Sequence, residues 1–215
     1  MNNNGVELKN IMKKQNNVRV AINGFGRIGR LFFRQFFGTK GFEIVAVNDL
    51  GDVENLAYLL KYDSVYRTWG HRVQVTGYRL QVNEKEIQMI AEKDPTKLPW
   101  RDLDIDIVVE ATGAFESFEK SNAHIVAGAQ RVVIASPAKD DEGVAGGRTV
   151  LAGINEDVLA TCKISSNGSC TTNAAAPIAA VIHESLGIAK GFLSTAHAYT
   201  GTQNLVDGAT KGKDF

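Results

Sequence analysis

Residues 18–29 read Val-Arg-Val-Ala-Ile-Asn-Gly-Phe-Gly-Arg-Ile-Gly, and this stretch decides the fold of the chain. Its first half, residues 18–23, is a short apolar run typical of a buried strand. Its second half places three glycines between that run and residues 30–37, which are rich in Phe and favour a helix. A second apolar run covers residues 42–47. Strand, glycine-rich turn, helix and strand therefore predict one βαβ unit with a right-handed crossover.

The glycines have the spacing Gly-x-Gly-x-x-Gly of a dinucleotide-binding turn. Alone this pattern is weak and fits an ordinary strand-turn-helix junction, but Asp49 ends the second predicted strand, 20 residues after Gly29. Gly24 permits the tight turn, Gly26 lets the backbone approach a pyrophosphate and Gly29 lets the helix pack closely. The helix N-terminus attracts the phosphates. Asp49 would bind the ribose hydroxyls and repel a 2′-phosphate, so we expect NAD rather than NADP.

The rest of the chain continues the alternation of helices and strands. Between residues 71 and 91 the apolar residues recur with period two, which predicts antiparallel hairpins with a turn at Asn83-Glu84. We therefore expect an α/β fold: a Rossmann-like doubly wound sheet with inserted antiparallel hairpins. The other predicted helices cover residues 53–61, 115–127 and 172–186, and the other predicted strands cover residues 105–110, 131–135, 150–154, 163–166 and 191–197.

The composition is that of a soluble globular protein, with 44% apolar and 22% charged residues. Lys+Arg and Asp+Glu number 24 each, so the basic excess of a nucleic-acid binder is missing. No apolar run approaches the roughly 18 residues of a membrane span. We expect a cytoplasmic protein with no membrane or nucleic-acid partner. The two cysteines are too few for a disulfide scaffold, and no residues show the spacing of metal ligands.

Cys170 is a candidate nucleophile. It lies at a predicted strand-to-helix turn, where a helix N-terminus would stabilise its thiolate. His197 ends the predicted strand 191–197, and the carboxyl ends of neighbouring parallel strands lie at one edge of a sheet. His197 could therefore face Cys170 as its base. Spacing alone fits a structural cysteine and histidine equally well, whereas Cys162 fits an inert core position better.

Six segments of the chain carry a resemblance to a known family: INGFGRIGR at residues 22–30, VNDL at 47–50, LKYDS at 60–64, EATG at 110–113, SNGSCTTN at 166–173 and HAYT at 197–200. They resemble phosphorylating glyceraldehyde-3-phosphate dehydrogenase, and the resemblance runs from about Val18 to Phe215. Gly168 stands where this family usually has Ala, and Lys93 stands where many members have Arg beside the adenine.

The resemblance implies a role for each matching residue. Cys170 would attack the aldehyde carbon as a thiolate, and His197 would activate the thiol and later accept the hydroxyl proton. The backbone N–H of Cys170 would hold the developing oxyanion. The positions implied for substrate or phosphate are Ser169, Thr171 and Thr200, and those for NAD are Gly24, Gly26, Arg27, Ile28, Gly29, Asp49, Lys93 and Ser136.

The resemblance also implies a reaction and an assembly. The family oxidises glyceraldehyde 3-phosphate in glycolysis, with NAD and inorganic phosphate, to 1,3-bisphosphoglycerate through a cysteine thioester, and it forms homotetramers. Erythrose-4-phosphate dehydrogenase is similar in both active-site motifs and stays an alternative. An NAD-binding module without turnover is a second alternative, from a different functional class.

Three parts follow from these segments. Residues 1–17 are polar and Asn-rich, and we expect a disordered tail there. Residues 18–168 are expected to form the NAD-binding Rossmann domain, and residues 169–215 to begin an α+β catalytic domain. Because the family's second domain normally continues well past Phe215, we expect a truncated member with an incomplete catalytic domain.

Overall fold

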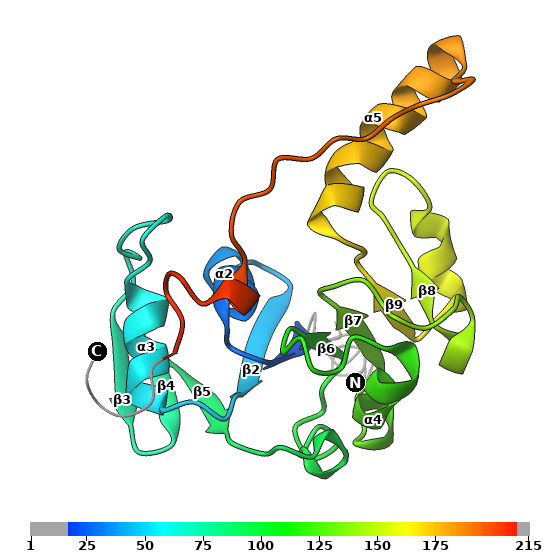
Figure 1. Cartoon of the computed structure of the whole chain (residues 1–215). Helices are drawn as coiled ribbons and strands as arrows, with labels where there is room; N and C mark the ends of the chain where they lie inside the picture. Colours follow the sequence, from blue (N-terminus) through cyan, green and yellow to red (C-terminus); the bar gives the residue numbers. More distant parts are fainter. Residues whose placement is uncertain (1–16, 210–215) are drawn as a thin grey trace, which may run out of the picture.

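A nine-stranded sheet lies at the centre of a computed structural model that describes residues 17–209 (Figure 1). The strand order is β3-β4-β5-β2-β1-β6-β7-β9-β8. The strands are β1 Val18–Asn23, β2 Phe42–Asn48, β3 Val73–Thr76, β4 Arg79–Val82, β5 Lys85–Ile90, β6 Ile107–Glu110, β7 Arg131–Ile134, β8 Arg148–Thr149 and β9 Ile164–Ser166. The α-helices are α2 Arg27–Phe36, α3 Val53–Lys61, α4 Phe118–Val126 and α5 Cys170–Leu186. Short 3-10 turns cover Pro95–Lys97, Val144–Gly146, Glu156–Thr161 and Gly201–Gln203.

The sheet confirms the predicted fold class. β1 lies between β2 and β6 and pairs parallel with both, so the connections leave it in opposite directions along the sheet. β4 pairs antiparallel with β3 and with β5, which confirms the predicted hairpins. Because β5 also pairs parallel with β2, the hairpins extend the main sheet at one edge. The carboxyl ends of β1, β2 and β6 thus meet at a topological switch point, where open α/β sheets bind ligands.

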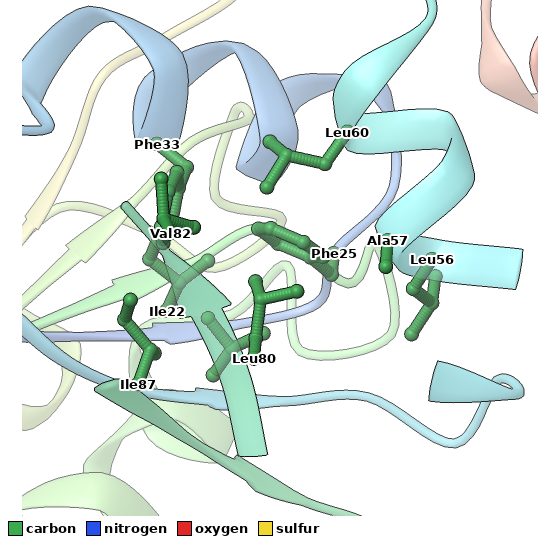
Figure 2. Close-up of a cluster of buried hydrophobic side chains, with 10 residues drawn as sticks. Ile22, Phe25, Phe33, Leu56, Ala57, Leu60, Leu80, Val82 and Ile87 are labelled. Atoms are coloured by element: carbon green, nitrogen blue, oxygen red, sulfur yellow. The ribbon is translucent and has the colours of Figure 1, made fainter. Parts of the chain in front are cut away.

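Apolar side chains cover both faces of the sheet, because successive residues of a strand point to opposite sides. On one face, Ile22 of β1 packs with Phe25, Phe33 of α2 and Leu60 of α3, as Figure 2 shows. On the other face, Ala21 packs with a cluster that includes Trp100 and Val108. Phe25 lies inside the glycine-rich turn and is fully buried. Its burial anchors that turn to the core.

The helices begin where a polar side chain can cap them. Asp52 accepts hydrogen bonds from two backbone N–H groups of α3, Ser117 accepts one from α4 and Ser169 accepts one from α5. Such caps satisfy donors that the helix itself leaves without partners. α2 is the exception, because its N-cap is Gly26, which has no side chain, and its first turn holds no acidic residue. The start of α2 is therefore left available to an external anion.

Two predicted strands are wrong. The strand expected at residues 150–154 does not form: β8 ends at Thr149, and a turn follows in which the Asn155 side chain accepts the N–H of Leu151. Gly153 has a φ of +74°, which a strand does not accommodate. Residues 191–197 have no regular structure. They run back beside α5, whose apolar side they face, and do not join the sheet (Figure 1).

Residues 1–16 of the predicted tail lie outside the described residues. None of the helices between residues 17 and 209 combines the length and the apolar character needed to cross a bilayer.

Candidate active site and cofactor cleft

The three glycines of the turn serve two different roles. A Cβ on Gly24, at a φ of +95°, would lie 2.6 Å from the backbone of Ala111 and of Thr112. A Cβ on Gly29 would lie 2.0 Å from the carbonyl oxygen of Gly24. A Cβ on Gly26 would have no atom within 4 Å. Gly24 and Gly29 therefore serve the packing of the turn, and Gly26 faces open space that a ligand can fill.

A cavity of about 440 Å³ opens at the switch point, next to this turn. The predicted residues Gly24, Gly26, Asp49 and Lys93 line it. Its position beside the uncapped N-terminus of α2 suits a pyrophosphate, because the first N–H groups of a helix have no partner inside the helix. The remaining lining residues are Asn23, Asn48, Leu50, Glu92, Pro95, Ala111, Thr112, Ala114 and Phe115. The open cradle at Gly26 and this lining fit a dinucleotide.

Backbone hydrogen bonds hold the Asp49 carboxylate in place. One oxygen accepts from the N–H of Phe25 at 2.6 Å and the other accepts from the N–H of Gly51 at 2.8 Å. The first of these bonds joins the end of β2 to the glycine-rich turn. A fixed negative charge therefore stands at the cavity, where the sequence predicted the ribose contact.

Two arginines of α2, Arg27 and Arg30, bind the segment near Asp207. Arg27 lies 2.6 Å from the Asp207 carboxylate, which also accepts from Ser64. Burial would raise the pKa of Asp207, but the hydrogen bonds from Ser64 and Arg27 outweigh it and lower that pKa. Arg30 donates to the carbonyl groups of Phe25 and Asp207, and burial lowers its pKa to about 10. The side chain of Arg27 is thus paired with Asp207.

Two further cofactor positions do not line the cavity. Ile28 follows Arg27 in the first turn of α2, and the residue is 55% exposed. Ser136 follows β7, and its carbonyl accepts from the hydroxyl of Ser166 at 2.7 Å. The structure fixes the loop at Ser136 but does not bring its side chain to the cavity. The nicotinamide contact therefore stays a prediction.

Cys170 and His197 are in direct contact. Cys170 Sγ lies 3.0 Å from His197 Nε2, and Cys170 is the first residue of α5. The hydrogen bond from His197 lowers the pKa of the Cys170 thiol, aided by the backbone of Thr171. Bonding to the carbonyl of Ala198, and then to Cys170, raises the pKa of His197. Both shifts favour a thiolate beside an imidazolium. The structure brings together the two residues that the sequence analysis placed face to face, although the supporting strand is absent.

An apolar groove of about 810 Å³ lies beside this pair. α5 and residues 188–198 form its two walls, and Thr171 lines it together with Cys170 and His197. Ser169 caps the helix through Thr172, at 2.9 Å from its N–H. Thr200 lies beyond the groove, where it caps the turn Gly201–Gln203. Of the three predicted substrate residues, the structure brings only Thr171 into the groove, with Ser169 adjacent in the chain.

Several cavity residues were not predicted as site residues. Asn23 and Asn48 end β1 and β2, and Thr112 follows the end of β6. Their signal in the sequence was their place directly after a buried parallel strand, which is where such sheets bind ligands. The pairing of distant strands was needed to bring them together.

Two models of known domains match the chain. The model "Glyceraldehyde 3-phosphate dehydrogenase, NAD binding domain" matches residues 18–118, and "Glyceraldehyde 3-phosphate dehydrogenase, C-terminal domain" matches residues 169–215. The chain belongs to the glyceraldehyde-3-phosphate dehydrogenase family. The cofactor is therefore NAD, and the cleft at the switch point lies within the part that matches the NAD-binding model.

Relatives named glyceraldehyde-3-phosphate dehydrogenase cover most of the chain. The protein from Thermotoga maritima is 50% identical over 192 residues, which are 88% of this chain and 56% of that protein. The protein from Clostridium pasteurianum is 47% identical over 198 residues, 92% of this chain and 58% of its own length. A relative from Trypanosoma brucei brucei, named as cytosolic, is 44% identical over 198 residues, which are 92% of this chain and 58% of that protein. The chain thus spans little more than half the length of these family members.

We expect this family member to bind NAD at least about tenfold more tightly than NADP. The fixed Asp49 carboxylate would face a 2′-phosphate, and close like charges are costly at an interface. Calorimetric titration of both cofactors at one salt concentration measures the ratio. Asp49→Asn should reduce the ratio of NAD affinity to NADP affinity, because the negative charge of the side chain is lost. Equal affinities of the unaltered chain for NAD and NADP would contradict the prediction.

Proposed function

We propose that the chain carries the cofactor-binding and nucleophilic parts of a phosphorylating glyceraldehyde-3-phosphate dehydrogenase. Such an enzyme converts glyceraldehyde 3-phosphate, NAD and inorganic phosphate to 1,3-bisphosphoglycerate and NADH, a step of glycolysis. The observation that supports this most is the 3.0 Å contact between Cys170 Sγ and His197 Nε2 at the start of α5, in a member of this family.

Cys170 begins the reaction as the nucleophile. His197 Nε2 holds the thiol proton while the sulfur forms a bond to the aldehyde carbon. The carbonyl oxygen then carries the developing negative charge, and the backbone N–H of Cys170, at a helix N-terminus, faces that charge favourably. Protonation of this oxygen gives a hemithioacetal.

His197 acts again in oxidation. NAD, when bound, supplies the acceptor for the hydride of the hemithioacetal carbon. His197 takes the hydroxyl proton in the same stage, so the carbon becomes a thioester carbonyl. An oxygen of inorganic phosphate then attacks this carbon, the carbon–sulfur bond breaks, and Cys170 leaves as a thiolate. The lowered pKa of the Cys170 thiol makes it a good leaving group.

The remaining predicted residues bind the phosphates and the cofactor. Thr171 lines the groove beside the nucleophile, and Ser169 orders the first turn of α5. We assign these two residues and Thr200 to the phosphate groups. We assign the backbone of Arg27 and Ile28 to the pyrophosphate of NAD, Asp49 to the ribose, Lys93 to the adenine and Ser136 to the nicotinamide end.

The proposal extends to domains, location and assembly. We place the NAD-binding domain at residues 18–168 and the start of the catalytic domain at residue 169, one residue before α5. A cytoplasmic location is supported by the relative from Trypanosoma brucei brucei that is named as cytosolic. The homotetramer of the family is the proposed assembly.

An assay of NADH formation tests the proposal. Glyceraldehyde 3-phosphate and NAD are supplied with and without inorganic phosphate, and erythrose 4-phosphate is the rival substrate. In a form of the protein as long as its relatives, phosphate-dependent NADH formation with the three-carbon substrate is the expected result. Faster turnover of erythrose 4-phosphate would favour the related dehydrogenase. NAD binding without NADH formation from either aldehyde would favour a binding module.

We expect Cys170 to be alkylated by iodoacetamide at least about tenfold faster than Cys162 at pH 7. The thiol of Cys170 is exposed and has a lowered pKa, whereas burial raises the pKa of Cys162. Only the thiolate reacts, so the alkylation rate of Cys170 follows the ionisation of its thiol as the pH rises. The inflection of this pH–rate profile should lie below pH 9.0, the ordinary pKa of a cysteine thiol. His197→Asn should move that inflection to higher pH. Peptide mapping after limited labelling measures both sites, and preferential labelling of Cys162 would overturn the assignment.

A further inference from the structure

Buried polar side chains form a connected network beneath the cofactor cavity. They come from the ends of three neighbouring strands, from α4 and from the loop after Pro95–Lys97. Each is no more than 5% exposed, and the members are Asn23, Asn48, Trp100, Glu110 and His124. Polar groups buried to this degree are costly unless each finds a partner. The hydrogen bonds within the network must therefore supply partners for these buried polar groups.

Glu110 is the acceptor at its centre. One carboxylate oxygen accepts from the backbone N–H of Thr112 at 2.8 Å and from the Thr112 hydroxyl. The other accepts from the side-chain amide of Asn23 and lies 3.0 Å from His124 Nε2. Four donors thus converge on the two oxygens of one carboxylate, which as an ionised group offers acceptors only.

Trp100 decides which nitrogen of His124 carries the hydrogen. The indole N–H can only donate, and it lies 3.0 Å from His124 Nδ1. Nδ1 must therefore be the acceptor, and Nε2 must carry the hydrogen that is donated to Glu110. The two contacts therefore fix one tautomer of the His124 ring, with the hydrogen on Nε2.

The network reaches the cavity through Thr112 and Asn23, which both line it. A Cβ on Gly24 would lie 2.6 Å from the Thr112 nitrogen, so the glycine-rich turn rests directly on the peptide that Glu110 holds. Asn23 in turn accepts from Asn48 at 2.7 Å, which links the ends of β1 and β2. Glu110 therefore fixes two sides of the cleft at once.

We propose that Glu110 is a positioning residue for NAD, and that His124 and Trp100 keep its carboxylate aimed. Glu110 holds Thr112 and Asn23 at the spacing that the cofactor requires, without touching the cofactor itself. This assignment rests on NAD binding at the switch-point cavity.

The test is a double-mutant cycle on the full chain, with NAD affinity measured by calorimetry well below the unfolding temperature. Glu110→Gln replaces one carboxylate oxygen with an NH₂ group. In either orientation of the new amide, this NH₂ donor faces donors of the network. The NAD dissociation constant should rise at least about tenfold, since buried donors then lose their acceptor. Trp100→Phe frees Nδ1 of His124 to carry the hydrogen, so that Nε2 can accept from the new amide. The double variant Glu110→Gln/Trp100→Phe should therefore bind NAD more tightly than Glu110→Gln alone. If the two substitutions only damaged the structure, their losses of NAD affinity would add, and the double variant would bind NAD more weakly.

Two further comparisons separate positioning from stability. Asp106→Asn disturbs a carboxylate at the other end of β6, which accepts from Arg19 and Gln130, and should lower the melting temperature without changing NAD affinity. Thr112 is exposed, so its variants should fold even if Glu110→Gln does not. Thr112→Val removes the hydroxyl donor and should weaken NAD binding, whereas Thr112→Ser should retain it.

The outcomes distinguish this assignment from the proposed function. An unaltered chain that does not bind NAD overturns both. An unaltered chain that binds NAD, together with unchanged affinity in Thr112→Val and in any folded Glu110→Gln, overturns the positioning role alone. Absence of rescue by Trp100→Phe in a folded Glu110→Gln background also overturns it.

Discussion

Gly29→Ala is expected to lower the free energy of unfolding by more than about 3 kcal/mol, the upper end of the cost of overpacking. A Cβ at this position would lie 2.0 Å from the backbone carbonyl of Gly24, which cannot rotate away as a side chain can. Gly26→Ala should fold normally, because its Cβ meets no atom within 4 Å, and should lose NAD binding. Urea unfolding and NAD titration measure the two effects separately.

Gly70→Ala is the matched control for these two variants. A Cβ on Gly70 also meets nothing within 4 Å, and this residue does not line the cofactor cavity. We expect unchanged NAD affinity and a stability equal to or slightly above that of the unaltered chain, because alanine restricts the unfolded state. A Gly29→Ala chain of normal stability, or a Gly26→Ala chain with normal NAD affinity, would contradict the roles given to these glycines.

Local sequence signals were sufficient for the first half of the fold. The run 18–29 carries both the strand and the turn, and the limits of α3 match the predicted helix, which Asp52 caps. The wrong prediction of a strand at residues 150–154 has a local cause too. At residues 150–154 the side chain of Asn155 accepts a backbone donor that a strand would use in its ladder. A pattern of apolar residues does not record that competition.

The buried network under the cleft could not be predicted from the sequence. Glu110 and His124 are 14 residues apart, but Asn23 is 87 residues from Glu110, and only the parallel pairing of β1 with β6 joins them. The contact of Cys170 with His197 was predicted from a strand that does not form. Residues 191–197 reach the same place by running back along α5, whose apolar side attracts them.

In a full-length form, Cys170→Ser is expected to reduce phosphate-dependent NADH formation by roughly four to six orders of magnitude, as loss of a catalytic nucleophile does. A serine hydroxyl cannot form the thioester and, at neutral pH, is far less ionised than the Cys170 thiol, whose pKa the His197 contact lowers. His197→Asn should reduce the rate by about two to four orders of magnitude, the usual effect of losing a general base. Steady-state rates with saturating NAD measure both.

Cys162→Ser is the control, because its thiol is buried near the start of β9 and does not line the groove. It should keep the rate within about threefold and lose only stability, since a hydroxyl replaces a packed thiol. NAD affinity should be unchanged in all three variants, because neither cysteine nor His197 lines the cofactor cavity. If Cys170 and His197 act as a unit, the double variant will be no slower than Cys170→Ser alone. Additive losses would mean that His197 serves a step in which the sulfur of Cys170 takes no part.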